Sequence, residues 1–176
     1  LKLSHFFNKE GIFSGMIGQS YKFKNPDFFD KGSGLEKKLS DFIVDILFKP
    51  NKEITFSYRG RLDENDINLR RSEFDMLLNY EKWGIRAGHV LLNNIEILNF
   101  KEQRELRFAS FINITDRWLI QSAIRYDEVS KKSLNNRISL VYIDDCISFE
   151  IGFRRKFSEY RDLKPSNSFM VKFNVF

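Results

Sequence analysis

The chain has 176 residues and a formal net charge of +5, and 19 of its residues are Phe. Hydrophobic residues make up 42% of the sequence, which excludes an intrinsically disordered chain. Charged residues of both signs are interspersed, so no basic arm is predicted and nucleic acid is not an expected partner. The longest apolar run, Leu140 to Ile143, is far shorter than the roughly 18 residues of a transmembrane helix.

Alternation of apolar and polar residues with a period of two dominates the chain and predicts β-strands with two different faces. In chain order, the runs lie at residues 40–48, 54–63, 104–112, 117–127 and from 146 onward. In the clearest run, Phe56, Tyr58 and Leu62 share one face, while Arg59 and Arg61 share the other. We predict about ten strands of about ten residues, plus the end of one more strand at residues 1–7.

The connections between these runs alternate in length. Short connections are predicted at residues 8–11, 50–52, 79–82, 115–116 and 144–145. Longer connections are predicted at residues 25–37, 63–66, 93–103, 127–135 and 156–166. Outer-membrane β-barrels have this order, because their strands of about 9–11 residues are joined by short periplasmic turns and longer outer loops.

These features predict an all-β fold, an antiparallel transmembrane β-barrel with an apolar outer face and a polar inner face. Candidate aromatic residues at the membrane interfaces are Trp83, Trp118, Tyr58, Tyr126 and Tyr142. Because no signal peptide opens the chain and its first strand is incomplete, we expect residues 1–176 to be the C-terminal part of a larger barrel. The first strands and an N-terminal domain would then lie outside this sequence. Two alternatives stay open: another outer-membrane barrel, such as a porin or receptor, and a soluble all-β binding module.

Several short stretches, taken in order, resemble the C-terminal barrel region of the LptD family of lipopolysaccharide-assembly outer-membrane proteins. The resemblance extends from about Gly18 onward. The stretches are Gly18-Gln19-Ser20-Tyr21, Gly32-Ser33-Gly34-Leu35, Ser40-Asp41, Tyr58-Arg59-Gly60-Arg61-Leu62-Asp63, Leu69-Arg70-Arg71-Ser72-Glu73, Asp144-Asp145-Cys146, Gly152-Phe153-Arg154-Arg155 and Arg161-Asp162-Leu163-Lys164-Pro165.

The resemblance implies a protein that transports lipopolysaccharide and assembles it into the outer leaflet of the bacterial outer membrane. It implies no enzymatic activity and no cofactor. The implied partners are lipopolysaccharide, outer-membrane lipid, an LptE-type lipoprotein plug, and a periplasmic LptA-type bridge that acts through the missing N-terminal domain. This chain would form the closing side of the barrel, with its last strand near the seam where the lipid leaves.

Cys146 is the only cysteine of the chain. By parity it shares the polar face with Ser148 and Glu150, and by loop order it follows a short turn at the oxidising periplasmic rim. In the LptD family, cysteines at the matching place link the barrel to the N-terminal domain, so the resemblance implies a disulfide to a cysteine outside this chain. The better-known family pattern is two adjacent cysteines, whereas Ile147 follows here, so one such bond at most is expected. An inert buried thiol is the alternative.

The candidate ligand contacts are arginines predicted on the polar face, because guanidinium groups bind phosphates and acidic sugars bidentately. They are Arg59, Arg61, Arg107, Arg125 and Arg154. The alternative for each is a compensating charge that merely lines the lumen. The resemblance assigns a lateral-gate strand to Phe169, Val171, Phe173 and Val175, for which an ordinary final strand is the alternative.

No catalytic or metal-binding residue is predicted. A Ser–His hydrolase needs a His beside a nucleophile and a carboxylate. His89 has no acidic neighbour two residues away in its predicted strand, and His5 lies in the incomplete first strand. Asp63, Glu64 and Asp66 lack the spacing and the turn glycine of a calcium loop, so we interpret them as a solvated outer loop.

Overall fold

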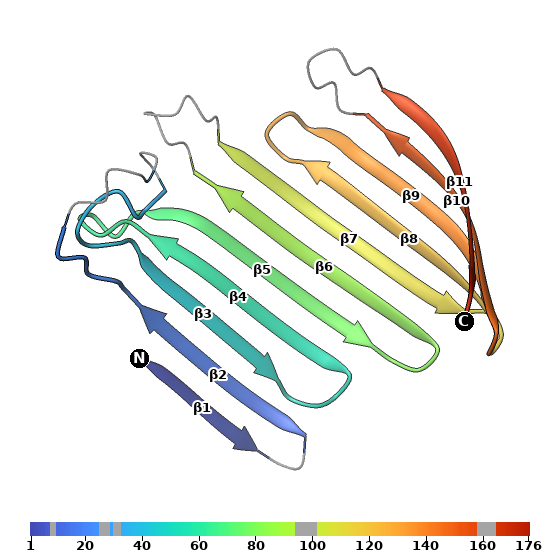
Figure 1. Ribbon diagram of the computed structural model, residues 1–176, viewed down its shortest axis with the longest axis horizontal. Coiled ribbons are helices and arrows are strands. Elements are labelled where there is room, and N and C mark those ends of the chain that lie inside the picture. The colour runs from blue at the N-terminus through green and yellow to red at the C-terminus, as the bar shows by residue number, and fades with distance from the viewer. Residues whose placement is uncertain (8–9, 25–28, 30–32, 94–101, 158–164) are drawn as a thin grey trace. The chain divides into compact units, whose positions relative to one another are not determined.

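The computed structural model describes residues 1–7, 10–24, 29, 33–93, 102–157 and 165–176, and all of its regular elements are strands. Eleven strands form one sheet whose order follows the chain from β1 to β11 (Figure 1). The prediction of about ten strands plus the end of one more is confirmed. The strands are β1 (Lys2–Phe7), β2 (Gly11–Gly18), β3 (Phe42–Lys49), β4 (Ile54–Leu62), β5 (Leu69–Asn79), β6 (Trp83–Leu92), β7 (Gln103–Asn113), β8 (Trp118–Asp127), β9 (Lys132–Ile143), β10 (Ile147–Lys156) and β11 (Ser166–Val175).

The chain divides into two compact units. The first unit consists of Leu1–Met76 and Gly88–Arg104, and the second consists of Leu77–Ala87 and Glu105–Phe176. In each unit the strand pairs with a described register are antiparallel neighbours. Across the described part of the chain, no helix has the length and apolar character needed to cross a bilayer.

Short turns follow the odd-numbered strands from β1 to β9, and longer connections follow β2, β4, β6 and β10, as predicted. The predicted alternation does not hold after β8, because residues 128–131 form a connection no longer than the turn at residues 114–117. One predicted loop, residues 127–135, is wrong in its extent. Strand β9 begins at Lys132, and Ser133 and Asn135 pair with Tyr126 and Arg125 of β8. Because these residues are polar, the alternation of apolar and polar side chains does not indicate the start of β9. Backbone pairing, however, does not need apolar side chains. The predicted loops at residues 25–37, 93–103 and 156–166 lie largely outside the described residues.

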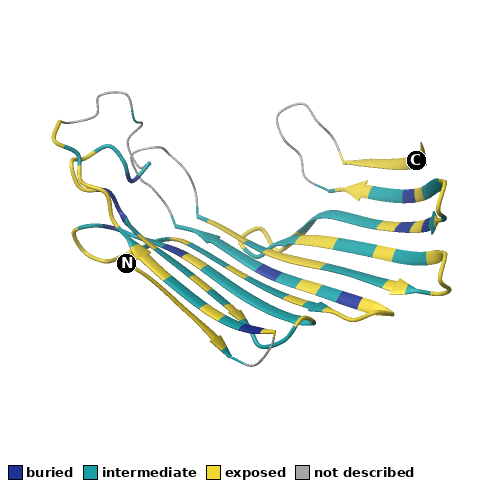
Figure 2. Cartoon of the chain, turned by 60° about the horizontal axis from the view of Figure 1, so that its bottom comes forward, coloured by how far each residue is buried: buried dark blue, intermediate teal, exposed yellow. Residues whose placement is uncertain are grey.

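Burial in this sheet is the reverse of that in a soluble protein. Among the residues that the structure describes, Val141 is the only buried hydrophobic residue, whereas Ser40, Asp41, Asp63 and Ser139 are buried polar residues. Figure 2 shows that most positions along the strands are exposed or intermediate. A soluble β-sandwich buries apolar side chains between two sheets. The described chain has a single sheet without such a core, which argues against the soluble alternative.

The strands of the second unit have one polar and one apolar face, because paired residues in an antiparallel ladder point to the same side and neighbours alternate. The register β7–β8–β9–β10–β11 fixes both sets. The polar face carries Glu105, Arg107, Gln121, Arg125, Arg137, Ser139, Glu150, Arg154, Lys172 and Asn174. The apolar face carries Phe108, Ile120, Ile124, Ile138, Leu140, Phe149, Ile151, Phe153, Phe169, Val171, Phe173 and Val175.

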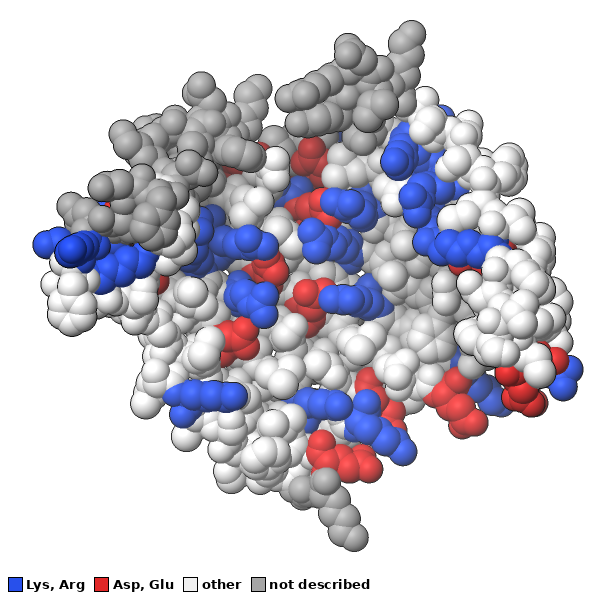
Figure 3. Space-filling view, in the orientation of Figure 1, with Lys and Arg blue, Asp and Glu red and all other residues white. Residues whose placement is uncertain are grey.

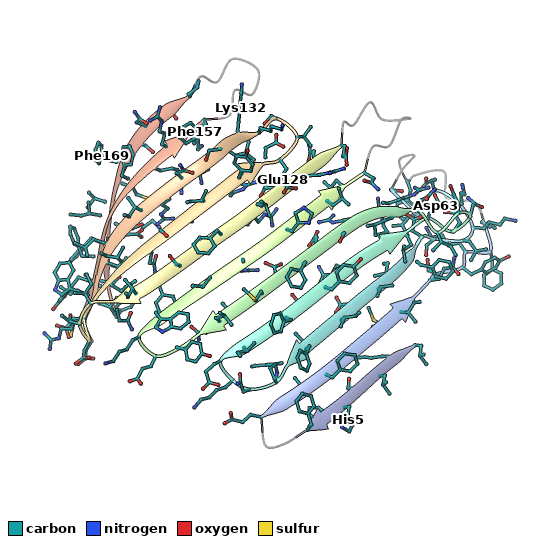
Figure 4. The ribbon with its side chains drawn as sticks, turned by 180° about the vertical axis from the view of Figure 1, so that it is seen from behind. His5, Asp63, Glu128, Lys132, Phe157 and Phe169 are labelled. Carbon is teal, nitrogen blue, oxygen red and sulfur yellow. The ribbon has the colours of Figure 1, made fainter. Side chains whose placement is uncertain are left out.

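The first unit repeats this arrangement with fewer charges. Asp45 pairs with Arg59 on its polar face, and Ile46 pairs with Tyr58 on its apolar face. Many large apolar side chains on both units remain solvent-exposed, for example Ile46 at 36% and Ile138 at 54%. Figure 4, which views the sheet from behind, shows aromatic and aliphatic side chains along the strands, with the labelled Phe169 at β11 and His5 at β1. An apolar surface of this extent needs a lipid or protein partner.

Candidate functional site

Aromatic side chains on the apolar face gather next to the short turns. In the first unit, the ring of Phe48 lies 6.0 Å from that of Phe7 and 6.2 Å from that of Phe56. In the second unit, Tyr80 stacks on Trp83 at 4.7 Å, and Trp118 and Tyr142 lie 5.0 Å apart. We call these residues the short-turn girdle. Such rings belong at a membrane–water interface, where one side of the ring meets lipid and the other meets water.

The predicted interface residues Trp83, Trp118 and Tyr142 belong to this girdle, whereas Tyr58 and Tyr126 do not. Tyr126 lies near the opposite end of β8, eight residues beyond Trp118. At about 3.3 Å per residue, this separation is roughly 26 Å along the strand. This length is comparable to the apolar band of about 25 Å on outer-membrane barrels. Because barrel strands are tilted, the height that the strand spans across the membrane is somewhat smaller than its length.

A polar rim lies beside the girdle at the turn between β9 and β10. The Tyr142 hydroxyl donates to Asp144 at 2.9 Å, and an Arg117 nitrogen lies 3.2 Å from the same carboxylate. The backbone amide of Asp145, the Tyr142 hydroxyl and the charge of Arg117 lower the pKa of Asp144, which therefore stays ionised at the water interface.

The polar face of the second unit carries two places where arginines lie opposite each other on paired strands. Arg107 of β7 is opposite Arg125 of β8, and Arg137 of β9 is opposite Arg154 of β10. Like charges that are directly opposite in a sheet destabilise it. Each pair therefore needs a compensating anion, and the two pairs differ in how they are compensated.

Glu105 bonds to both arginines of the first pair. Its carboxylate accepts hydrogen bonds from Arg107 Nε at 2.6 Å, from Arg125 Nε at 2.9 Å and from an Arg125 Nη at 2.7 Å. The two bonds from Arg125 go to both carboxylate oxygens, which is the strongest geometry for such a pair. Arg107 and Arg125 thus have the pairing expected of a structural lumen charge.

Glu150 compensates only half of the second pair. It accepts a hydrogen bond from Arg137 and lies 3.5 Å from the ammonium of Lys172. Arg137 also donates through Nε to Ser139 at 3.1 Å, so its side chain extends along the strand. Within the described residues no carboxylate contacts Arg154, although this residue is only partly exposed. Among the described residues, Arg154 is therefore the member of this pair that no carboxylate compensates.

Figure 3 shows Lys and Arg interleaved with Asp and Glu over the middle of the strands, and further basic groups over the long-loop ends of β9 and β10. A hollow of about 260 Å³ lies in this face of the second unit. Its floor is formed by short side chains, and Arg137 belongs to its lining. The other lining residues include Gly84, Ala109, Phe111, Gln121, Ala123 and Ser139.

In the first unit, Arg59 pairs with Asp45 at 3.2 Å on the polar face, and both side chains are exposed. Arg61 has a different position. Its Nη1 donates to the carbonyl of Ser33 at 2.7 Å, and its Nε lies 3.3 Å from Asp41. The candidate lumen arginines therefore do not form one group, because Arg61 joins a separate cluster at the long-loop end.

This cluster, which we call the Asp41 cluster, consists of Glu36, Lys37, Asp41, Arg61, Asp63, Glu64 and Arg70. It joins the segment before β3 to the loop between β4 and β5 and to the start of β5. Arg70 bonds to Asp63 and lies 3.7 Å from Asp41 and 4.0 Å from Glu36, and Lys37 pairs with Glu64. Figure 4 shows Asp63 among the loops at this end of the strands. The cluster therefore ties residues 33–41 to two neighbouring strands.

Asp41 is the centre of this cluster, and its side chain is only 2% exposed. Its backbone amide donates to the carbonyl of Gly34 at 3.0 Å, which closes the segment 34–41. Gly34 has a φ of 75°, and a Cβ atom there would lie 2.4 Å from Asp41 Oδ2. Glycine is needed at position 34 both for this backbone conformation and for the close approach of the carboxylate.

The carboxylates of the cluster influence each other's protonation. Burial raises the pKa of Asp41, and a hydrogen bond with Glu64 raises it further, although Arg70 and Arg61 act in the opposite direction. Burial would raise the pKa of Glu64 as well, but hydrogen bonds from Lys37, its own backbone amide and Asp41 outweigh burial and lower it. The two carboxyl groups therefore differ in the direction in which the cluster shifts their pKa.

The prediction that residues 63–66 form a solvated loop is wrong for two of its residues. Asp63 is 7% exposed, and the Glu64 side chain is 9% exposed. Asp41, Asp63 and Glu64 present carboxylate oxygens within 4.8 Å of one another. Arg61, Arg70 and Lys37 compensate these charges. The arrangement has the character of a buried ion-pair network, because three cations lie among the three carboxylates. The expectation of no metal site stays a prediction.

Cys146 lies in the turn just before β10, with an exposed and free thiol. Its carbonyl accepts a hydrogen bond from the amide of Phe176 at 3.0 Å. The short-turn position agrees with the expected rim placement, and the expected disulfide to an outside cysteine stays a prediction. An inert buried thiol does not fit the exposure of this residue.

The four predicted gate residues lie on the apolar face of β11, which is an edge strand in the order of this sheet. They are 61–81% exposed, more than most apolar residues of the inner strands, because no strand follows β11 in the described order. These positions are Phe169, Val171, Phe173 and Val175. Their role in a gate stays a prediction.

Reasoning from the sequence did not select Arg137 or Asp41 as functional candidates. Arg137 was missed because the predicted loop at residues 127–135 stopped the count of strand positions just before it. Parity from Leu140 and Tyr142 backwards would have placed it on the polar face. Asp41 was quoted only as part of a motif, since its partners come from segments about 20 and 30 residues away.

The LptD family, described as LPS transport system D, matches residues 3–118 of the chain. A search of the curated proteins found no match. The family match includes the Asp41 cluster and the strands β2 to β7, and ends at the first residue of β8. Because it covers more than half of the 176 residues, the chain belongs to the LptD family. The family is one of outer-membrane β-barrel proteins of lipopolysaccharide transport, which is not an enzymatic activity.

Proposed function

Starting from membership of this family, we propose that residues 1–176 form the closing, C-terminal side of a barrel that delivers lipopolysaccharide to the outer leaflet of the outer membrane. The observation that carries the proposal is the two-faced sheet. Its apolar face is exposed and ends in an aromatic girdle, and its polar face carries a surplus of arginine. Family membership alone supports lipopolysaccharide transport in general. The closing position rests on the order of the sequence stretches that resemble the family.

The proposed orientation follows from the girdle and the loops. The apolar face meets lipid, the polar face lines the lumen, the short turns face the periplasm, and the longer loops face outwards. In this orientation the Asp41 cluster lies at the outer rim, where it fixes the segment 33–41 over the ends of β4 and β5. Cys146 lies at the periplasmic rim.

The polar face suits a ligand with several negative charges. On β7 to β11 it carries seven basic residues, Arg107, Arg125, Lys132, Arg137, Arg154, Lys156 and Lys172, against three acidic residues, Glu105, Asp127 and Glu150. Seven minus three leaves four positive charges on this wall. Lipopolysaccharide carries phosphates and acidic sugars, so its hydrophilic part is the ligand that we assign to the lumen side.

The remaining elements of the proposal concern partners. An LptE-type lipoprotein would occupy the lumen, and an LptA-type bridge would reach the barrel through an N-terminal domain outside this sequence. The exposed gate residues of β11, from Phe169 to Val175, would meet the first strand of the complete barrel, where acyl chains pass into the membrane. These partners are proposed from the resemblance to the family.

The test is depletion of the native full-length protein in its own cell, followed by measurement of newly made lipopolysaccharide at the cell surface. We expect that newly made, pulse-labelled lipopolysaccharide no longer becomes accessible to a lipid A deacylase that is added outside the cells. A porin would give a different outcome, namely unchanged surface lipopolysaccharide together with slower uptake of small solutes. That outcome would overturn the proposal.

The covalent link is tested separately. Outer membranes from the native cell are digested without reducing agent, and the peptide that contains Cys146 is identified by mass spectrometry. We expect it to be joined to a peptide from an upstream periplasmic domain. A free Cys146 thiol in freshly alkylated membranes would contradict the disulfide and leave the transport proposal in place.

A further inference from the structure

We propose that Arg154, together with Arg137, forms a binding site for a phosphate group on a saccharide that occupies the hollow in the polar face of β7 to β9. This inference rests on the proposed function and deepens it, because it assigns one ligand group to named residues. Its basis is the difference between two arginine pairs that are otherwise arranged alike.

The two arginine pairs differ in the carboxylates that compensate their charges. Glu105 bonds to both arginines of the Arg107–Arg125 pair. In the Arg137–Arg154 pair, Glu150 bonds to Arg137 and is shared with Lys172, and no carboxylate of the described chain contacts Arg154. Directly opposed like charges destabilise a sheet, so an uncompensated pair is retained only at a cost. A ligand anion supplies the missing negative charge.

The second step is the shape of the wall beside the pair. Arg137 lines the hollow of about 260 Å³, and the short side chains of Ala109, Ala123 and Ser139 are also part of its lining. In the register, Ser139 is opposite Gly152, so the strand surface next to Arg154 is also low. A Cβ atom at Gly152 would lie 3.3 Å from Ser139 Oγ, which shows how closely this floor is packed. The short side chains of Ala109, Ala123 and Ser139 leave room for a sugar ring in the hollow.

The third step is the chemistry of the ligand. A guanidinium group offers parallel N–H donors that match two oxygens of a phosphate. Gln121 and Ser139 in the lining add neutral hydrogen-bonding groups of the kind that sugar hydroxyls use. A phosphorylated sugar therefore matches the site, with its phosphate at the arginines and its ring over the small residues. An apolar acyl chain does not match this lining, because it would desolvate the arginines without pairing them.

The experiment uses the full-length protein in nanodiscs of phosphatidylcholine, so that the lipid itself carries no net charge. Binding is measured for native phosphorylated lipopolysaccharide, for the same lipopolysaccharide after enzymatic removal of its phosphates, and for inorganic phosphate. The variants are Arg154→Gln, Arg154→Lys and the control Arg155→Gln. Arg155 is the next residue of β10, points to the opposite face and contacts the ring of Phe157, so its replacement removes the same charge from outside the site.

We expect Arg154→Gln to weaken binding of phosphorylated lipopolysaccharide about tenfold or more, because a charge-assisted hydrogen bond contributes roughly that factor. Arg154→Lys should lose less, since it keeps the charge and loses the bidentate geometry. Arg155→Gln should bind like the wild type, and the dephosphorylated ligand should not distinguish the three variants. Retention of heat-modifiable migration on gels shows that each variant still forms its barrel.

Four outcomes would overturn the inference or its basis. Equal binding of phosphorylated lipopolysaccharide by the wild type and Arg154→Gln would overturn this site alone and leave the transport function in place. An equal loss for both forms of lipopolysaccharide would show that the phosphate is not the group that is bound. Failure of the wild-type protein to bind either form would overturn the proposed function, and the site with it. Strong competition by millimolar inorganic phosphate would identify the site as one for the free ion and would overturn the saccharide assignment.

Discussion

The Asp41 cluster of the first unit and the polar face of the second unit both bring arginines together, but they use them differently. In the cluster, Asp41 and Asp63 are buried, and the side chains of Arg61 and Arg70 are 25% and 20% exposed. Each cation there lies within ion-pair distance of a carboxylate. On the polar face, Arg107 and Arg125 are 50% exposed, and Arg154 has no such partner among the described residues.

Burial distinguishes charges that stabilise the fold from charges that are available to a ligand. A buried charge without its partner costs several kcal/mol, so burial requires compensation inside the fold. A charge on an open face retains water and tolerates an incomplete set of partners. The cluster therefore holds a loop in place, while the open wall leaves positive charge for a ligand.

The largest effect is expected for Asp41→Ala. Removing the shared carboxylate leaves Arg61 and Arg70 without their central partner, which should cost about 3–5 kcal/mol of local stability, as for other broken buried ion pairs. Hydrogen exchange of the peptides that cover residues 33–41, measured on the full-length protein in nanodiscs, reports this opening. The control is Asp45→Ala, which breaks an exposed pair with Arg59 and should cost well under 1 kcal/mol. Equal effects of the two variants would show that burial does not distinguish the cluster.

The second prediction tests which face of the wall meets lipid. Ile124 is 44% exposed on the apolar face of β8, and Gln121 lies on the polar face of the same strand. Ile124→Arg should destabilise the folded barrel by about 2–4 kcal/mol, whereas Gln121→Arg should be close to neutral. Denaturant unfolding in liposomes measures both. A larger cost for Gln121→Arg would reverse the face assignment and the proposal that arginines line the lumen.

The third prediction concerns the backbone of the cluster. Gly34→Ala places a methyl group against the Asp41 carboxylate at a φ that disfavours any side chain, which should cost about 1–3 kcal/mol of local stability. The glycine at position 15 is a matched control, because a Cβ there meets nothing closer than 4.0 Å. Hydrogen exchange of residues 33–41 should therefore increase in Gly34→Ala and remain unchanged in Gly15→Ala.

These regions also differ in how much of them the sequence could predict. The two faces of the second unit followed from alternation, because a period of two assigns every side chain of a strand once its direction is known. The identity of Arg59, Arg107, Arg125 and Arg154 as polar-face residues was obtained in this way. The extent of β9 was not, since the polar residues Ser133 and Asn135 do not alternate with apolar ones, although they pair with β8.

The Asp41 cluster could not be predicted from pattern, because no local signal tells that Asp41, Asp63 and Arg70 meet. Each of them lies at the end or outside of a strand, where alternation has stopped and charged residues usually indicate solvent. The left-handed conformation of Gly34 and the closure by Asp41 emerge only when three segments converge. The compensation of Arg107 and Arg125 by Glu105 likewise depends on which side-chain conformations are chosen within a correctly predicted register.

The fourth prediction is the pH dependence of the cluster. The pKa of Asp41 is raised above its ordinary value of 3.8, so the folded cluster binds a proton more tightly than the open one, and stability declines as the pH rises through the raised pKa. The pKa of Glu64 is lowered from 4.5, so its contribution is lost only as the pH falls below that value. As the pH rises through the raised pKa of Asp41, the opening free energy of residues 33–41 should therefore fall. Asp41→Asn cannot ionise at this position, so it should abolish this change of the opening free energy with pH. The hydrogen-exchange rates are first corrected for their intrinsic pH dependence.

The smallest effect is expected for a variant that makes the Arg107–Arg125 pair resemble the Arg137–Arg154 pair. Glu105→Gln removes the anion that bonds to Arg107 and Arg125 and keeps the size of the side chain. If missing compensation is what makes an arginine pair bind phosphate, this variant should bind phosphorylated lipopolysaccharide a few-fold more tightly, which corresponds to under about 1 kcal/mol. The dephosphorylated form should bind as before. Unchanged affinity for the phosphorylated form would mean that position on the wall, rather than charge balance, decides which arginines meet the ligand.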